Sequence, residues 1–158
     1  MNKSDVTQIS IKPLSVNEPS EKELGEVALV LLPFLLPQKR SKANQEEFVQ
    51  FVSEDKDINV HAASLKSIFP VIVVKGGFEG ILSSSIVADK QVLFEVEGGM
   101  LEATMLLFAT YYVFMFEYPS TLNNFSTYLH KRIFNIPDSR KLPTSVICFV
   151  NELESKDD

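Results

Sequence analysis

The chain has 158 residues, of which 45% are hydrophobic and 23% are charged, a composition that is typical of a globular domain and excludes a wholly disordered chain. Its formal net charge of -6 repels phosphate backbones, so no nucleic-acid partner is expected for this chain alone. The single cysteine, Cys148, excludes an internal disulfide. Together with a polar amino terminus that lacks a signal segment, it indicates an intracellular protein, either cytoplasmic or nuclear.

Two apolar runs raise the question of a membrane. Residues 27–36 are too few to cross a bilayer, and Pro33 interrupts them. Residues 103–116 are also fewer than the roughly 20 residues of a spanning helix, and Glu102 and Glu117 bracket them. The sequence therefore favours buried core helices and predicts no membrane partner. A membrane-associated protein anchored through residues 103–116 stays as a third hypothesis.

The amino-terminal part of the chain contains a predicted arm and a predicted helix. Residues 1–19 are polar and contain two prolines, which indicates a flexible arm ahead of the folded domain. Ser20 and Glu23 have the spacing of a capping box, in which a hydroxyl and a carboxylate bond the first free amides of a helix. Apolar residues then recur at helical spacing. Pro33 lacks the amide that a helix needs, so we expect this helix to kink or end near Leu32.

A basic connector, residues 38–42, follows this helix and predicts an exposed segment. Asn44 and Glu47 repeat the capping spacing, and the apolar residues after them are arranged as in an amphipathic helix. The sequence therefore predicts a short helix over residues 48–52.

A strand-rich region occupies the centre of the chain. Residues 69–74 form a run of β-branched and aromatic residues that two glycines close, which is typical of a strand. Residues 84–88 and 91–96 flank Asp89 and Lys90 and predict a β-hairpin. We expect these strands to form a small antiparallel sheet.

The last third of the chain predicts three helices. The first, over residues 100–116, is apolar on almost every side, and such a helix belongs at the centre of a domain. Residues 120–134 and 145–153 each carry a single apolar stripe. The sequence thus predicts the α+β class, with a small antiparallel sheet packed against a mostly helical carboxy-terminal half. We expect one domain over residues 20–153 and a frayed acidic tail over residues 154–158.

Metal ligands are sparse in this chain. A closed zinc site needs three or four ligands, most of them nitrogen or sulfur, whereas His61, His130 and Cys148 lie far apart and in no ligand spacing. Cys148 lies between apolar residues of a short predicted helix, where a half-buried, inert thiol is the usual case. The sequence therefore predicts neither a metal site nor another cofactor.

A glycine-rich turn, from Gly76 to Gly80, follows a predicted strand as a phosphate-binding loop does. It lacks the final Gly-Lys-Ser/Thr of such a loop and no helix follows it, so an ordinary turn is the simpler interpretation. The serines after it, Ser83, Ser84 and Ser85, fit no nucleophile elbow. A small ligand-binding domain or enzyme that uses this turn and these serines stays as the alternative hypothesis. A closed pocket beside either histidine would favour it.

The aromatic content indicates a different function. Twelve phenylalanines and four tyrosines gather mainly in the second half of the chain, and either one generously packed core holds all of them or some remain outside it. Aromatic side chains left outside the core favour a surface for association. The candidates are Tyr111, Tyr112, Phe114 and Tyr128. The leading hypothesis is therefore a non-enzymatic protein-interaction or self-association module, whose partner is another protein or a second copy of this chain.

Several strings of this sequence resemble a known family. They are LLPFLLP at residues 31–37, EFVQFV at 47–52, PVIVV at 70–74, LFA at 107–109, YVF at 112–114, YPSTLNN at 118–124, YL at 128–129 and FNI at 134–136. Together they resemble the carboxy-terminal region of a large set of uncharacterised vertebrate proteins, abundant in fish, some labelled sterile-alpha-motif-domain-containing-like and many similar to mobile-element products. The resemblance covers residues 22–153 and brings no assigned activity and no catalytic motif. It implies further modules upstream in longer relatives, so we expect this chain to be a fragment or a truncated copy.

Overall fold

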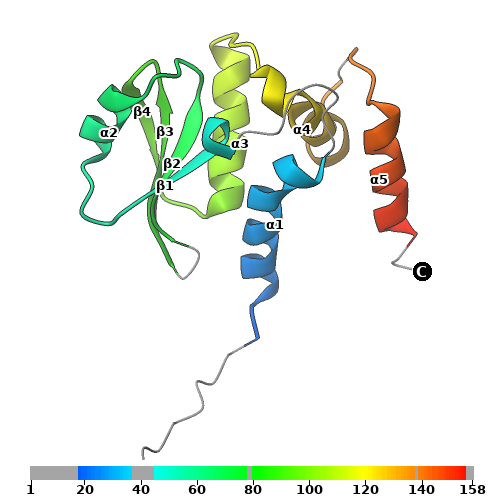
Figure 1. Cartoon of the computed structure of the whole chain (residues 1–158), viewed down its shortest axis with the longest axis horizontal. Coiled ribbons are helices and arrows are strands. Elements are labelled where there is room, and N and C mark those ends of the chain that lie inside the picture. The colour runs from blue at the N-terminus through cyan, green and yellow to red at the C-terminus, as the bar shows by residue number, and fades with distance from the viewer. Residues whose placement is uncertain (1–17, 37–44, 78–79, 138, 156–158) are drawn as a thin grey trace, which may run out of the picture.

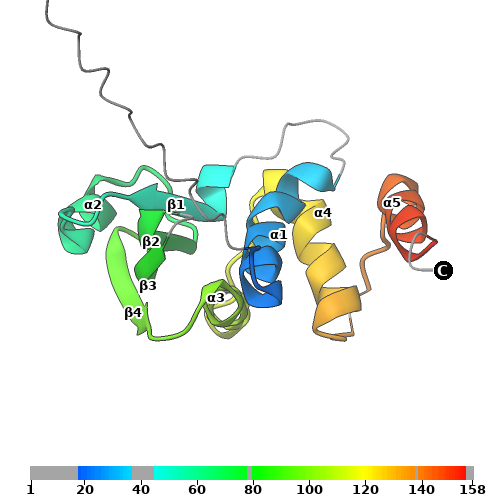
Figure 2. The ribbon, with the colours of Figure 1, turned by 90° about the horizontal axis from the view of Figure 1, so that it is seen from below.

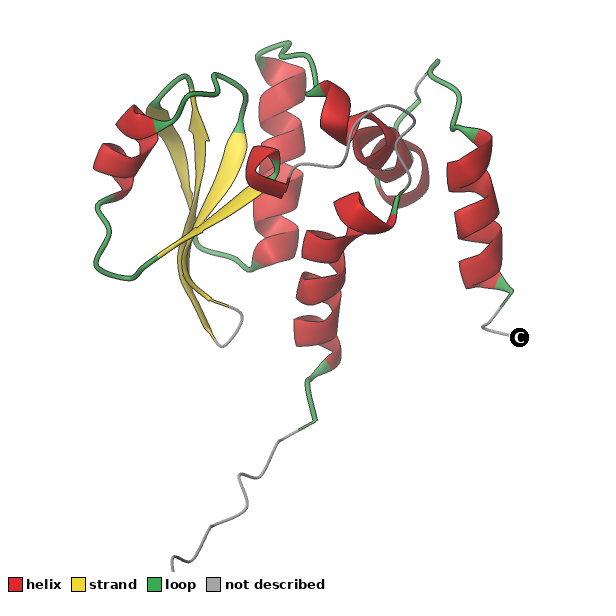
Figure 3. Cartoon of the chain, in the orientation of Figure 1, coloured by secondary structure: helices red, strands yellow, loops and turns green. Residues whose placement is uncertain are grey.

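A computed structural model describes residues 18–36, 45–77, 80–137 and 139–155 of the chain (Figure 3). The fold is α+β, as predicted. Residues 1–17 of the predicted arm, the connector at 38–42 and residues 156–158 of the predicted tail lie outside the described residues. In chain order the elements are α1 (Glu21–Leu35), β1 (Val49–Val52), α2 (Ile58–Ser64), β2 (Val71–Gly77), β3 (Gly80–Ala88), β4 (Gln91–Val96), α3 (Met100–Val113), α4 (Asn123–Tyr128) and α5 (Thr144–Glu154).

The four strands form one mixed sheet in the order β1-β2-β3-β4. β1 runs parallel to β2, with Val49 beside Ile72, and the other two pairs are antiparallel. The prediction of an antiparallel sheet is therefore wrong at this edge, and so is the helix predicted over residues 48–52. Pairing explains both differences. β1 completes a ladder with β2 and places Phe48 and Val49 in the core, which the capping spacing at Asn44 does not reveal.

The predicted hairpin is confirmed by β3 and β4. Asp89 and Lys90 form its two-residue turn, and their φ angles are both positive, 47° and 65°. A type I′ turn requires positive φ at both central positions, and its twist matches that of the strands it joins. The strand predicted over residues 69–74 is confirmed as β2.

Different helices cover the two faces of the sheet: Figure 1 and Figure 2 show α2 on one face and α3 on the other. Beyond α3, Figure 2 shows α1, α4 and α5 in a row that leads away from the sheet. Successive side chains of a strand point to opposite faces, so each strand contributes to both layers. On the α2 side a small cluster contains Ala62, Val71, Val73 and Val87. On the α3 side a larger cluster joins the sheet to the helices and includes Val30, Ile72, Val74, Ile86, Leu107, Phe125 and Val146.

α1 begins at the predicted capping box. Ser20 Oγ accepts a hydrogen bond from the Glu23 amide at 3.3 Å, and the Glu23 carboxylate accepts one from the Ser20 amide at 2.7 Å. The amide and then the hydroxyl of Ser20 lower the pKa of the Glu23 carboxyl. Pro33 led us to expect a kink or an end near Leu32. The helix instead continues to Leu35, with Pro33 inside it. Pro33 is buried, and the burial of its ring offsets the hydrogen bond that the proline lacks.

The helices of the last third differ from the prediction mainly in their ends. α3 stops at Val113, before the predicted end at residue 116. The helix predicted over residues 120–134 consists of a 3₁₀ turn (Ser120–Leu122), α4 and a π-helical turn (Leu129–Ile133). α5 confirms the third predicted helix.

Candidate interaction surface

The four aromatic residues proposed from the sequence lie in three different environments. Tyr111 is buried, with 3% of its surface exposed, and its hydroxyl donates to the carbonyl oxygen of Pro70 at 2.9 Å. Burial raises the pKa of this hydroxyl above its ordinary value. Tyr128 is half-buried against the core, whereas Tyr112 and Phe114 are exposed. Tyr111 is thus a core residue, and of the four candidates Tyr112 and Phe114 stand at an open surface.

α3 is apolar on its buried side and also on its solvent side. Ala103 and Leu107 lie on the buried side. On the solvent side Leu101, Met105 and Tyr112 are 47%, 52% and 73% exposed. A surface helix normally carries polar residues on its outer face, and large exposed apolar patches on soluble proteins mark interaction sites. The outer stripe of α3 is therefore the main candidate for a functional surface.

Met105 and Tyr112 of this outer stripe belong to one wall of an apolar groove. The groove has a volume of about 290 Å³, near the lower end of the roughly 300–1,000 Å³ of ligand pockets. The opposite wall comes from the π-helical turn and the residues after it, so two separate segments of the helical half build the site. We call this site the α3 groove. It is lined by Met105, Phe108, Ala109, Tyr112 and Val113 of α3 and by His130, Phe134 and Ile136 of the opposite wall.

Aromatic packing joins the two walls of the α3 groove. Tyr118 Oη lies 2.7 Å from His130 Nε2, and the Tyr118 ring stacks on that of Tyr111, with centroids 4.4 Å apart. The ring of Phe108, which lines the groove, lies 5.4 Å from that of His130 and 5.3 Å from that of Phe134, between centroids. The groove therefore rests on a closely packed aromatic cluster, which fixes its shape.

A methionine in an unfavourable backbone conformation follows the groove. α3 ends in a Schellman arrangement, in which the Phe116 amide donates to the carbonyl of Tyr111 at 3.0 Å and Met115 has a φ of 55°. Glycine is favoured at such a left-handed position, since a side chain there costs about 1–2 kcal/mol. Met115 nonetheless stands here with 87% of its surface exposed, next to the exposed Phe114. The stability of the fold therefore does not explain why a methionine, and not a glycine, occupies this position. We call the α3 groove together with Phe114 and Met115 the α3 surface.

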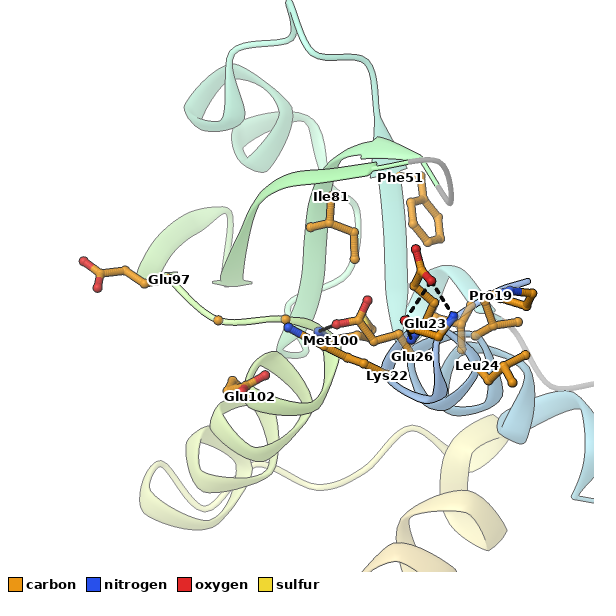
Figure 4. A pocket seen from close by; sticks show the side chains of 15 residues that line it. Pro19, Lys22, Glu23, Leu24, Glu26, Phe51, Ile81, Glu97, Met100 and Glu102 are labelled. Atoms are coloured by element: carbon orange, nitrogen blue, oxygen red, sulfur yellow. Dashed lines mark hydrogen bonds between the residues drawn. The ribbon is translucent and has the colours of Figure 1, made fainter. Parts of the chain in front are cut away.

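A larger pocket, of about 760 Å³, lies between the start of α1, the start of α3 and the sheet (Figure 4). Phe51 and Ile81 project into it from the sheet (Figure 4). The Glu26 carboxylate accepts a hydrogen bond from the Met100 amide at 3.2 Å, and so satisfies one of the free amides at the start of α3. A side chain at Gly99 would meet this carboxylate and displace it from the Met100 amide. Glu26 thus holds α1 against the start of α3.

The three residues considered as metal ligands lie on different elements. His61, on α2, has its Nε2 2.9 Å from Gln50 Oε1, and burial followed by the charge of Lys56 lowers its pKa. His130 faces Tyr118, and Cys148 on α5 is exposed rather than half-buried as expected. Across residues 18–36, 45–77, 80–137 and 139–155, no group of three or more histidine, cysteine, aspartate or glutamate side chains is placed to hold a metal ion.

The three serines of the alternative hypothesis are divided between the faces of the sheet. Ser84 pairs with Val74, which belongs to the cluster under α3, and the Ser84 hydroxyl is buried with no hydrogen-bond partner among the described residues. Ser83 and Ser85, one residue to either side, therefore point to the α2 face. All three border a pocket of about 530 Å³, but the Ser84 hydroxyl is shielded from solvent and neither histidine lines this pocket. Of the turn from Gly76 to Gly80, residues 78 and 79 lie outside the described residues.

The two most apolar helices, α1 and α3, have 15 and 14 residues. In the part of the chain that the structure describes, no helix combines the length and the apolar character that a membrane span needs. α3 packs with one side on β2 and β3 and touches α1 with another.

No family model matches the chain, and no curated protein or solved structure matches it either. The family resemblance therefore stays a prediction. What the α3 surface can bind is inferred from the residues of this chain alone.

Proposed function

We propose that the chain is a non-enzymatic protein-interaction module, and that the α3 surface binds an apolar segment of a protein partner. The observation that carries this proposal is the exposed outer stripe of α3, where Met105 and Tyr112 border a preformed groove. Removing apolar surface from water is favourable by about 25 cal/mol per Å². A partner that covers this stripe therefore gains affinity from side chains that the isolated chain leaves exposed.

The lining of the α3 groove suits an apolar anchor. Its lining residues are aromatic or aliphatic except His130, whose Nε2 already faces the Tyr118 hydroxyl. In protein interfaces a few large side chains in well-packed pockets carry most of the affinity, and aromatic residues and methionine are enriched there. An amphipathic helix that directs one large aliphatic or aromatic side chain into the groove fits this chemistry.

A charge in the α3 groove is expected to prevent partner binding. Met105→Glu and Val113→Glu each place a carboxylate on a wall that the partner covers, and burying such a charge without a counter-charge is strongly unfavourable. Both residues are exposed, so the fold should tolerate the changes. When the tagged chain is purified from cells and bound proteins are quantified by mass spectrometry, we expect both variants to retain the same partner at least about tenfold less.

Leu153→Glu is the matched control, because Leu153 is also exposed but lies on α5. An equal loss in this control, or full retention by the groove variants, would contradict the proposal. Met115→Gly separates binding from stability. Glycine relieves the left-handed conformation, so the free energy of unfolding should rise by about 1 kcal/mol while the amount of retained partner falls.

A further inference from the structure

The face of the sheet that α2 covers changes from apolar to polar along its length. Under α2 it carries the small apolar cluster of Val71, Val73 and Val87. Figure 1 shows that the tip of β2 and β3 extends beyond α2. Toward this tip β3 contributes Ser83 and Ser85, which point to the α2 face and line the pocket of about 530 Å³. We call this pocket the α2-side pocket.

Side chains of opposite charge stand on the two sides of the α2-side pocket. Ser83 pairs with Lys75 of β2, and Ser85 pairs with Glu95 of β4. Paired residues project to the same face of a sheet, and all four line the pocket. β3 lies between the other two strands, whose backbones are therefore about 10 Å apart, or two strand spacings. The short serine side chains leave a hollow between the longer lysine and glutamate.

The buried hydroxyl of Ser85 indicates that this hollow takes a polar molecule. Ser85 is 5% exposed, and among the residues that the structure describes no group forms a hydrogen bond with its Oγ. Buried polar groups in native proteins nearly always have a partner, so one without a partner that borders a pocket points to a bound molecule. Lys75 and Glu95 are likewise joined by no ion pair in the described part of the chain.

We propose that the α2-side pocket binds a small dipolar molecule of the amino-acid class. The Lys75 ammonium binds the carboxylate of this ligand, and the Glu95 carboxylate binds its ammonium group. The hydroxyls of Ser83 and Ser85 bond the polar atoms between them. A simple anion such as phosphate would face the glutamate, and a simple amine would face the lysine. Only a ligand that carries both charges satisfies both sides of the pocket.

The remaining lining favours a basic amino acid such as arginine. Glu97 adds a second carboxylate, whereas Lys75 is the one basic side chain among the described residues of the lining. One cation and two carboxylates complement a ligand with two cations and one carboxylate. Ile58 and Val92 also line the pocket and offer apolar contact to the methylene stem of such a ligand. Glutamate, with two carboxylates, has the wrong balance of charge.

This site shares no residue with the α3 surface and lies on the other face of the sheet from α3. Variants in the two sites therefore give separate results, and the two proposals fail independently.

Titration of the isotope-labelled chain, followed by NMR, tests the site. We expect L-arginine to give saturable shifts at the amides of Ser83, Ser85 and Glu95, with a dissociation constant at least about tenfold lower than that of L-glutamate. Lys75→Met removes the ammonium and keeps the stem, so it should weaken arginine binding at least about tenfold. Lys66→Met is the matched control, since Lys66 is exposed and lies outside the pocket.

The hydroxyl of Ser85 is tested by a pair of neighbouring substitutions. Ser85→Ala should weaken arginine binding roughly threefold to tenfold without lowering the urea midpoint of the free chain, because its hydroxyl has no partner there. Ser84→Ala removes the same atom from the other face of the sheet and should leave the affinity unchanged. Absence of saturable shifts overturns the proposal, as does arginine binding that Lys75→Met leaves intact. Equal affinity for glutamate, or tighter binding of inorganic phosphate, also overturns it.

Discussion

Phe125→Ala is expected to lower the free energy of unfolding by about 3–5 kcal/mol, the range for the loss of a buried phenylalanine ring. Phe125 is 1% exposed, and its ring lies edge-on to that of Phe48, with centroids 4.7 Å apart, and 6.3 Å from that of Phe108. It thereby joins α4 to the start of the sheet and to α3. In a domain of this length each kcal/mol of lost stability lowers the melting temperature by about 2–4 °C, so the melting temperature should fall by roughly 6–20 °C. The loss is a large part of the about 5–15 kcal/mol that stabilises a whole domain.

Phe114→Ala is the control for this change. Phe114 is exposed, so its truncation should alter the free energy of unfolding by less than about 1 kcal/mol. Calorimetry or urea-induced unfolding of the two variants measures the difference. Equal destabilisation by both changes would contradict the assignment of Phe125 to the core and of Phe114 to the surface.

Tyr111→Phe is expected to cost about 1–3 kcal/mol, although it removes a single oxygen atom. The Tyr111 hydroxyl donates to the carbonyl of Pro70, a buried residue, and leaving a buried acceptor without its donor carries a desolvation penalty. Tyr112→Phe, at the next position, removes the same atom from an exposed side chain and should change stability very little. Urea-induced unfolding of the two variants compares them directly. A similar midpoint for both would show that the hydroxyl of Tyr111 does not stabilise the fold.

Some elements of this fold could be predicted from the sequence, because short motifs of neighbouring residues determine them. The capping box at Ser20 and Glu23 marks the start of α1, and Asp89 with Lys90 marks the hairpin turn. β1 could not be predicted in this way, because its four residues are a strand only through their pairing with β2. The end of α1 depends in the same way on burial of Pro33, which the residues around it do not reveal.

The candidate site could be predicted only in part. The sequence shows that the helix from Met100 is apolar all round, and for that reason it gives no indication of which side faces the core. Tyr111 and Tyr112 are neighbours in the sequence, yet one is buried and the other exposed. Tyr118 and His130, which support the groove, gave no sequence signal as a pair because twelve residues separate them. Met115 was missed since its left-handed backbone appears only in the structure.

Two helices of this chain, α1 and α3, carry exposed apolar side chains, among them Leu31 and Met105. Each belongs to a helix whose other side is anchored in the core, α1 through Val30 and α3 through Leu107. A packed core holds these side chains in fixed positions, so a partner of the kind proposed would bind without a prior ordering of the chain, which lowers the entropy cost of association.

Photo-crosslinking from the α3 groove tests the proposed function most directly. Tyr112 is replaced by p-benzoylphenylalanine, which keeps an aromatic ring at this exposed position, and the chain is irradiated in cells. We expect a crosslinked product of one defined mass, larger than the chain by the mass of a different protein. This product should disappear in combination with Val113→Glu and should not form when the crosslinker stands at Leu153. The absence of a product at position 112, or the same product from position 153, would contradict the account.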